Sequence, residues 1–360
     1  MIKNKNKIKV FVGVSGGVDS SVALALLKNE GYDVTGVFIK TWQPDFIECT
    51  WKEERRDAIR VCAALDVPFL TFDLENDYKR GVADYMISEY KLGRIPNPDV
   101  MCNREVKFGA FWKRAKSMGA DFIATGHYAQ NIYNKNDESF ELVKSIDETK
   151  DQSYFLYRLN NKDLSHVLFP IGKYKKSQIR VLAKKFKLPT ANKKDSQGIC
   201  MLGDLDVKDF LSHYIKNKKG NVLNENGEVI GNHDGAYVFA LGERHGFTIT
   251  AKNSNSKPYY VISKDMKKNT ITVGLKSQNL VPANKAGITI SNLSFVNEPP
   301  VLGKKYTAQI RYHGEFEKCE ILEVSKENIK IFFKNNVLVS PGQSVVLYEN
   351  IVCLGGGIVI

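Results

Sequence analysis

The chain has 360 residues, which is more than one ordinary core holds and predicts two or three domains. A formal net charge of +12 favours a polyanionic partner. The six cysteines form no C-x-x-C pair, which disfavours a zinc ribbon or thioredoxin-like site and is typical of a reducing, cytoplasmic compartment. No apolar run of about 18 residues occurs, so we expect no membrane span.

Near the N-terminus, residues 9–27 read KVFVGVSGGVDSSVALALL. The apolar run 10–14 predicts a buried strand, Gly16 and Gly17 break it, and a helix with Asp19 and Ser20 at its start follows. This arrangement aims backbone N–H groups and the positive end of a helix dipole at one point. The segment therefore predicts an anion site.

The loop lacks two common phosphate-binding patterns. No lysine follows Gly17, as a Walker A motif requires, and no G-x-G-x-x-G is present. SGGVDSS instead resembles the PP-loop of the ATP pyrophosphatases, which cleave ATP between the α and β phosphates and pass an adenylate to a substrate oxygen. The resemblance implies that Asp19 helps to hold Mg²⁺, which prefers oxygen ligands, while a role as helix cap stays open.

The next part of the chain alternates between strand and helix patterns. We expect strands at 33–40, 67–72 and 120–125 and helices at 52–65, 77–92 and 105–118. Alternation of this kind predicts an α/β fold with a parallel sheet covered on both faces, and ligands bind at the carboxyl ends of such strands. The segments expected to line one pocket there are 15–21, 39–42 and 125–128.

Beyond this sheet we expect a hairpin at 130–143, a short helix at 150–159 and an amphipathic helix at 177–186. The stretch Lys173–Lys194 holds nine Lys or Arg and no Asp or Glu, which favours either phosphate contact or a solvated helix face. From about residue 280, short strands with turns between them predict a small β-barrel. The expected domains are a PP-loop domain at 1–204, a small central domain at 205–279 and a C-terminal β-barrel at 280–360.

Two polar loops each carry a cysteine. Cys102 follows Asp99 by three residues in NPDVMCN, and Cys200 follows Gly198 in DSQGIC. The two thiols could meet as a redox pair, and Cys102 could equally be a buried structural cysteine. A structural role is also expected for His127. The remaining cysteines are expected to be inert, and they are Cys49, Cys62, Cys319 and Cys353.

Seven motifs follow one another along the chain: SGGVDSS, GRIPNPDVMCNREVKF, ATGHYA, KDQSYFL, KKDSQGICMLG, RYHG and PGQSVVLY. In this combination the chain resembles the bacterial tRNA-specific 2-thiouridylases over essentially its whole length. That resemblance implies ATP-dependent adenylation of the C2 oxygen of the wobble uridine of tRNA. A cysteine persulfide then replaces AMP at C2, which leaves 2-thiouridine, AMP and pyrophosphate.

The resemblance also implies residue roles. Cys200 would carry the persulfide, Cys102 would be the nucleophile, the two would form a disulfide during turnover, and Asp99 would act as base or orient the uracil. The implied ATP contacts are Gly13, Val14, Ser15, Gly16, Gly17, Val18, Asp19, Ser20, Ile39 and Gly126. The implied contacts to the target base are Asn97, Pro98 and Asp99. The implied tRNA contacts are Lys150, Asp151, Gln152, Arg311 and Tyr312.

Further expectations are Mg²⁺ as cofactor, a sulfur-donor protein such as a cysteine desulfurase or sulfur-relay protein as partner, and a monomer. Two other functions stay open. One is a different PP-loop ligase or amidotransferase, which would need neither the paired loop cysteines nor the basic stretch. The other is a non-catalytic RNA-binding protein with a degenerate ATP site, which the intact Gly16, Gly17 and Asp19 disfavour.

Overall fold

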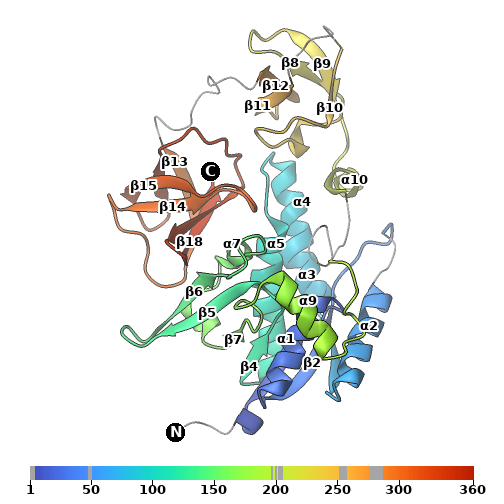
Figure 1. Ribbon diagram of the computed structural model, residues 1–360. Coiled ribbons are helices and arrows are strands. Elements are labelled where there is room, and N and C mark those ends of the chain that lie inside the picture. Colours follow the sequence, from blue (N-terminus) through green and yellow to red (C-terminus); the bar gives the residue numbers. More distant parts are fainter. Residues whose placement is uncertain are drawn as a thin grey trace.

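The computed structural model describes residues 5–47, 51–195, 198, 201, 206–250, 258–275 and 287–360. Figure 1 shows a lower part of sheet and helices, a C-terminal strand-rich part on the left and a small sheet at the top, above α4 (Asp84–Lys91). Among the described residues, no helix has both the length and the apolar character needed to cross a membrane.

A five-stranded parallel sheet organises the first part of the chain, in the order β3-β2-β1-β4-β7. Its strands are β1 (Lys9–Gly13), β2 (Asp33–Lys40), β3 (Phe69–Asp73), β4 (Phe122–Ala124) and β7 (Val167–Leu168). The predicted parallel sheet is confirmed. β7 was not predicted, since two residues are too few to show a strand pattern.

Two sets of helices cover the faces of this sheet. Val10 and Val12 of β1 pack with α1 (Val18–Asn29), α2 (Trp51–Ala64) and α9 (Lys176–Lys185), which together cover one face. The opposite face carries Phe11 and meets α3 (Glu75–Tyr78), α5 (Pro98–Met101) and α6 (Phe111–Ser117). Alternate side chains of one strand thus enter two different cores, as the pleat requires.

Two of the predicted helices contain π-helical turns. The segment expected at 77–92 is α3, then the π-helix η2 (Lys79–Ala83), then α4. The segment expected at 105–118 begins earlier, with the π-helix η3 (Cys102–Ala110) that leads into α6. π-Helical turns are rare and are frequent at functional sites, and periodicity of 3.6 residues does not reveal them.

The helix predicted at 150–159 is wrong in its extent, because only α7 (Ser153–Leu156) forms there. The Asp151 carboxylate accepts hydrogen bonds from the backbone N–H of Ser145 (2.9 Å) and of Ser153 (3.3 Å). These bonds hold residues 150–152 outside the helix, and side-chain bonds of this kind compete with helix formation. A further short helix, α8 (Asn161–Leu164), follows.

The C-terminal barrel is confirmed: pairing of β13 with both β16 and β18 closes it, and a hairpin from earlier in the chain extends its sheet from β18. Its eight-stranded sheet has the order β13-β16-β15-β14-β17-β18-β6-β5, with β13 also paired to β18. The strands are β5 (Ala129–Asn134), β6 (Ser139–Lys144), β13 (Ile288–Phe295), β14 (Lys305–Gln309), β15 (Glu317–Val324), β16 (Ile329–Phe333), β17 (Ser344–Glu349) and β18 (Val352–Val359). The predicted hairpin at 130–143 therefore joins the first part of the chain to the barrel.

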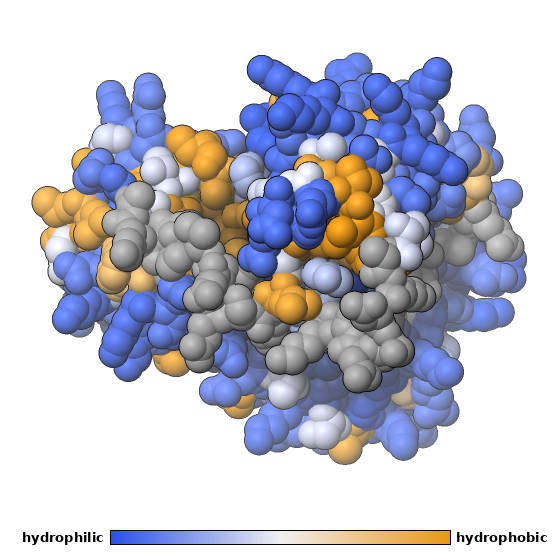
Figure 2. Space-filling model, turned by 90° about the horizontal axis from the view of Figure 1, so that it is seen from above, coloured by the Kyte–Doolittle hydropathy of each residue, from blue (hydrophilic) through white to orange (hydrophobic). Residues whose placement is uncertain are grey.

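A five-stranded sheet of order β10-β9-β8-β12-β11 lies between these parts in sequence. Its elements are α10 (Val207–Ser212), β8 (Gly220–Leu223), β9 (Val229–His233), η4 (Ala236–Val238), β10 (Phe247–Ile249), β11 (Tyr259–Asp265) and β12 (Thr270–Leu275). Seen from above, this side of the molecule is mainly hydrophilic, with separate apolar patches (Figure 2). The domain limits 204/205 and 279/280 stay a prediction.

Candidate functional site

The SGGVDSS loop is built at the carboxyl edge of the parallel sheet. β1 ends at Gly13 and α1 begins at Val18, with a sharp turn between them. Gly16 has φ +75°, and a Cβ atom there would lie 2.5 Å from the carbonyl oxygen of Glu54, so the turn requires glycine. The first turn of a helix presents unpaired N–H groups, so this loop has the form of an anion site.

Gly126 closes the other side of the loop. It follows β4, which pairs with β1 through Val12 and Ala124. A Cβ atom on Gly126 would lie 2.6 Å from the backbone nitrogen of Ser20. The predicted meeting of segments 15–21 and 125–128 at one sheet edge is therefore confirmed. His127 is buried and its Nδ1 lies 2.7 Å from Thr125 Oγ1, which supports a structural role.

Asp19 is the centre of a polar cluster at this edge. The Tyr128 hydroxyl donates to Asp19 Oδ1 at 2.7 Å, and burial together with the Asp19 charge raises the pKa of that tyrosine. The Lys176 ammonium lies 2.8 Å from both oxygens of Asp19. It also lies 2.8 Å from Asp195 Oδ1. One lysine of the basic stretch thus faces the loop instead of solvent.

Asp195 is held by three cations. Besides Lys176, it receives the Lys150 ammonium at 3.2 Å and the Arg180 guanidinium. Burial by itself raises the pKa of Asp195, but the bonds and charges of Lys176 and Lys150 outweigh burial and lower it. Asp195 precedes Cys200 by five residues in the chain.

The segment that carries Cys102, which was expected to be a polar loop, is helical, because Asn97 caps a helix that begins at Pro98. The Asn97 side chain accepts from the backbone N–H of Asp99 (3.1 Å) and of Val100 (3.2 Å), which starts α5. Cys102 follows as the first residue of η3 and has no exposed surface. Its side chain belongs to the core on one face of the parallel sheet, as expected of a structural buried cysteine. Reaction of this thiol therefore requires the segment to open.

A ring of α7 and a ring of the C-terminal part, those of Phe155 and Tyr312, pack against the core that contains Cys102. The rings of Phe155 and Tyr312 lie 4.3 Å apart, centroid to centroid. Burial, and then the charges of Asp151 and Asp99, raise the pKa of Tyr312 to about 12. Tyr312 packs against the core that contains Cys102, so the fold places a predicted tRNA contact on the same core as the predicted nucleophile. Arg311 is exposed, with its guanidinium bonded to the carbonyl oxygen of Leu338 at 3.3 Å.

Residues 150–153 connect Tyr128, which bonds to Asp19, with the C-terminal barrel. The backbone N–H of Gln152 donates to the carbonyl of Tyr128 (2.8 Å), and the Gln152 amide oxygen accepts from the N–H of Tyr128 (3.0 Å). On the other side, Ser153 Oγ lies 3.1 Å from the hydroxyl of Tyr348 in the barrel. The predicted tRNA contacts Asp151 and Gln152 thus also hold the loop and the barrel together.

The structure leaves one predicted residue untested. Cys200 lies outside the described residues, so the structure says nothing of its distance from Cys102. Sequence reasoning missed Lys176, Tyr128 and Phe155 as site residues. Lys176 stands in the basic stretch and the other two in ATGHYA and KDQSYFL, so each motif carried a signal, but no pattern told which side chain faces the loop.

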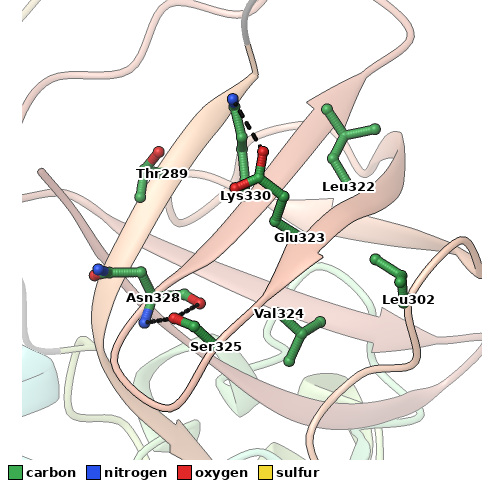
Figure 3. A pocket seen from close by; sticks show the side chains of 8 residues that line it. All are labelled: Thr289, Leu302, Leu322, Glu323, Val324, Ser325, Asn328 and Lys330. Carbon is green, nitrogen blue, oxygen red and sulfur yellow. Dashed lines mark hydrogen bonds and ion pairs between the residues drawn. The ribbon is translucent and has the colours of Figure 1, made fainter.

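A hollow of about 540 Å³ lies elsewhere, on the outer side of the barrel (Figure 3). The charged groups in it are paired with each other, since the Lys330 ammonium lies 3.3 Å from Glu323 Oε1. Asn328 and Ser325 likewise bond to one another. No predicted site residue lines this hollow, so it is not the candidate site.

Comparison with known proteins agrees with the three parts of the fold. A family model described as "tRNA methyl transferase HUP domain" matches residues 8–204. Models described as "tRNA methyl transferase PRC-barrel domain" and "Aminomethyltransferase beta-barrel domain" match residues 208–275 and 285–359. A protein of Listeria monocytogenes named tRNA-specific 2-thiouridylase MnmA is 42% identical over 99% of this chain and 96% of its own length.

The chain belongs to the tRNA-specific 2-thiouridylase family. A second 2-thiouridylase, from Bacillus subtilis, is also 42% identical over 99% of this chain and 96% of its own. Among solved structures, the "U34-tRNA thiolase NcsA from Methanococcus maripaludis with its [4Fe-4S] cluster" is 18% identical, with a TM-score of 0.36 over 59% of this chain and 65% of that one. At this low score we draw nothing from the likeness.

Proposed function

We propose that the protein is an ATP-dependent tRNA sulfurtransferase that converts the wobble uridine of tRNA into 2-thiouridine. The observation that carries the proposal is the identity of 42% with a named 2-thiouridylase over almost the full length of both chains. The geometry supports it, because Gln152 bonds to Tyr128 beside the anion site, and the carbonyl of Phe155, three residues later, accepts from the side chain of Asn103, next to Cys102.

In the proposed reaction, ATP binds at the SGGVDSS loop and adenylates the uridine C2 oxygen. This oxygen is a poor leaving group, and adenylation lets it depart as AMP. Asp99 would orient the uracil edge or accept a proton. The target base leaves its stack at little cost, because the anticodon loop is single-stranded. The ring pair of Phe155 and Tyr312 is a surface on which a base could stack.

Sulfur would arrive as a persulfide on Cys200, supplied by a sulfur-donor protein. Transfer to C2 followed by attack of the Cys102 thiol would cleave the remaining S–S bond and leave a Cys102–Cys200 disulfide. An external reductant would then restore both thiols. Because Cys102 is fully buried, the proposed sequence needs the segment from Asn97 to Ala110 to move when tRNA binds.

Mg²⁺ would be held at Asp19. The described residues contain no cluster of three or more His, Cys, Asp or Glu side chains arranged for a metal. A site with one carboxylate fits Mg²⁺, which keeps waters and takes phosphate oxygens as its other ligands. When bound, the ion would neutralise phosphate charge, while the loop residues bind and orient the phosphates.

The test is incubation of the protein with tRNA, ATP, Mg²⁺, a thiol reductant and a persulfide donor, a cysteine desulfurase with cysteine, followed by mass spectrometry of the tRNA nucleosides. We expect 2-thiouridine that depends on ATP. The variant Cys200→Ser is expected to release pyrophosphate with tRNA but to make no 2-thiouridine, whereas Cys319→Ser, a buried barrel cysteine, should keep the activity of any folded fraction. Persistent 2-thiouridine in Cys200→Ser would contradict the persulfide role.

The same assay separates the other functions. A ligase or amidotransferase for small molecules would release pyrophosphate without tRNA. An RNA-binding protein with a degenerate ATP site would bind tRNA and release no pyrophosphate.

A further inference from the structure

Asn103 is a buried amide next to Cys102 in the chain. It is the second residue of η3, and only 3% of it is exposed. Its Nδ2 donates to the carbonyl oxygen of Phe155 at 3.1 Å. Its Oδ1 is buried too, and no donor to it occurs among the residues that the structure describes. A buried acceptor without a donor costs free energy, so a ligand that donates to this oxygen would bind favourably.

The Phe155 carbonyl fixes which way the amide of Asn103 faces. A carbonyl oxygen only accepts hydrogen bonds, so Nδ2 and not Oδ1 must face it. Nδ2 carries two hydrogens, and the bond to Phe155 uses one of them. The amide therefore presents one acceptor, Oδ1, and one further N–H. Turning the amide over would set Oδ1 against the carbonyl oxygen, so the bond to Phe155 opposes the reverse arrangement.

A second buried amide oxygen, in Asn131, shows that an unpaired Oδ1 does not by itself mark a site. This oxygen also lacks a donor among the described residues. The Nδ2 of Asn131, however, donates to the carbonyl oxygens of both Leu164 (2.7 Å) and Val167 (2.8 Å). Both of its N–H groups hold neighbouring backbone, as in a purely structural amide. Asn103 differs because it keeps one N–H beside its free acceptor.

The place of Asn103 in the fold is the second observation. It follows the predicted nucleophile, and it bonds to the residue whose ring lies 4.3 Å from that of Tyr312. Phe155 and Tyr312 are only partly buried and pack against the core that contains Cys102. A base that stacks on such rings keeps its hydrogen-bonding edge free for a polar side chain. The amide of Asn103 thus lies between a stacking surface and a thiol.

We propose that Asn103 recognises the wobble uracil, with Oδ1 accepting from N3–H and the free N–H of Nδ2 donating to O4. The other uracil oxygen, O2, is the one that reacts. Cytosine carries an acceptor at N3, which would oppose Oδ1, so Asn103 separates uridine from cytidine. The proposal rests on the proposed function for the identity of the substrate. It requires that the movement which exposes Cys102 also exposes Asn103 and keeps its bond to Phe155.

The first test measures binding of anticodon stem-loop RNAs to the full-length protein by fluorescence anisotropy. The RNAs carry uridine or cytidine at the wobble position, and α,β-methylene-ATP is present because it cannot be cleaved between these phosphates. We expect the wild type to prefer uridine about 10- to 100-fold, as two base-edge hydrogen bonds allow. Asn103→Leu, which has a similar volume but no hydrogen-bonding group, should bind both RNAs within about threefold of each other.

Asn131→Leu is the matched control. It removes the structural amide of β5 and should keep the wild-type preference for uridine in its folded fraction. A merely structural role of Asn103 would weaken both RNAs alike and leave the ratio of their affinities unchanged. A wild-type ratio in Asn103→Leu, or a wild type without preference for uridine, would therefore overturn the proposal.

The second test changes the substrate and needs no variant, so it also serves if Asn103→Leu does not fold. A stem-loop with 3-methyluridine at the wobble position has no N3–H. We expect the wild type to bind it at least as weakly as the cytidine RNA, which lacks the same donor without added bulk. Equal affinities for the uridine and 3-methyluridine RNAs would overturn the proposal.

The outcomes distinguish this proposal from the proposed function. If the wild type makes 2-thiouridine while Asn103→Leu keeps the wild-type preference for uridine, only the role of Asn103 is wrong. If the folded wild type releases no pyrophosphate with tRNA and makes no 2-thiouridine, the proposed function is wrong and the role of Asn103 falls with it.

Discussion

A Cβ atom on Gly126 would lie 2.6 Å from the backbone nitrogen of Ser20, at the start of the helix that follows the SGGVDSS loop. The two residues come from different strand ends, 106 positions apart, and they meet because β1 and β4 are parallel neighbours. The contact is between two backbones, so it cannot be relieved by a change of rotamer. The shape of the anion site therefore depends on a residue outside its motif.

Gly126→Ala is expected to displace the loop, because Ser20 N and the Asp19 carbonyl carbon would both lie within 3 Å of the new methyl group. Overpacking of this kind costs about 1–3 kcal/mol of unfolding free energy. ATP affinity measured by calorimetry should fall at least about tenfold. Gly119→Ala is the control: its new Cβ meets nothing within 4 Å but strains a turn with φ +85°, so stability should fall while ATP affinity is kept.

Asn97→Ala is expected to lower the unfolding free energy by about 1 kcal/mol, because the cap of α5 is lost. The loss should also reduce thiolation, since the same cap holds the backbone of Asp99 at the start of α5, three residues before Cys102. Urea denaturation and the nucleoside assay measure the two effects. Asn97→Ser keeps a capping oxygen and should recover most of the stability. If Asn97→Ser were as unstable as Asn97→Ala, the cap would not be the cause.

Stability should depend on pH through His166. Its ring is stacked on Trp112 with centroids 3.9 Å apart, and burial lowers its pKa to about 4. The unfolded chain binds a proton near pH 6.5, so between pH 6.5 and pH 4 it holds more protons than the native state. The stability that His166 contributes is therefore complete above pH 6.5 and is lost as the pH falls towards 4.

The measurement is urea denaturation at pH 7 and pH 5. His166→Phe keeps a ring against Trp112 and should lose less unfolding free energy between these pH values than the wild type, by on the order of 1–2 kcal/mol. His245→Gln, at an exposed position, should lose as much as the wild type. If His166→Phe lost as much unfolding free energy between pH 7 and pH 5 as the wild type, groups other than His166 would cause the loss.

Leu142→Ala is expected to destabilise both the parallel-sheet part and the barrel. Leu142 is fully buried, and it pairs with Cys353 where β6 meets β18. Its core holds side chains from both parts, including Tyr154 and Tyr348. Truncation of a buried leucine costs about 2–5 kcal/mol. Ile132→Ala on the neighbouring strand, 44% exposed, should change stability by less than about 0.5 kcal/mol.

Two probes can follow this variant. The three tryptophans, Trp42, Trp51 and Trp112, report on the first part of the chain, and circular dichroism reports on all strands. We expect the unfolding midpoints reported by the two probes to shift together to a lower urea concentration. A shift confined to one probe would show that the barrel and the parallel sheet unfold independently.

Much of the fold could be predicted from the order of residue types. Alternating strand and helix patterns predicted the parallel sheet, and its carboxyl edge predicted where segments 15–21 and 125–128 meet. The patterns failed where bonds between a side chain and the backbone competed with the helix. Asp151 cuts the helix expected at 150–159 by accepting from Ser145, and periodicity carries no trace of that bond.

The sequence by itself determined the local chemistry: a glycine turn before a helix for an anion, a cysteine three residues after Asp99, and the family to which these motifs belong. Such features depend on neighbours in the chain, whose preferences are local. Only the tertiary structure decided which of the nine cations in Lys173–Lys194 faces Asp19, and that the hairpin of β5 and β6 pairs with β18 of the barrel. Both follow from the packing of segments far apart in the chain, where register and side-chain direction are set by partners that no local pattern names.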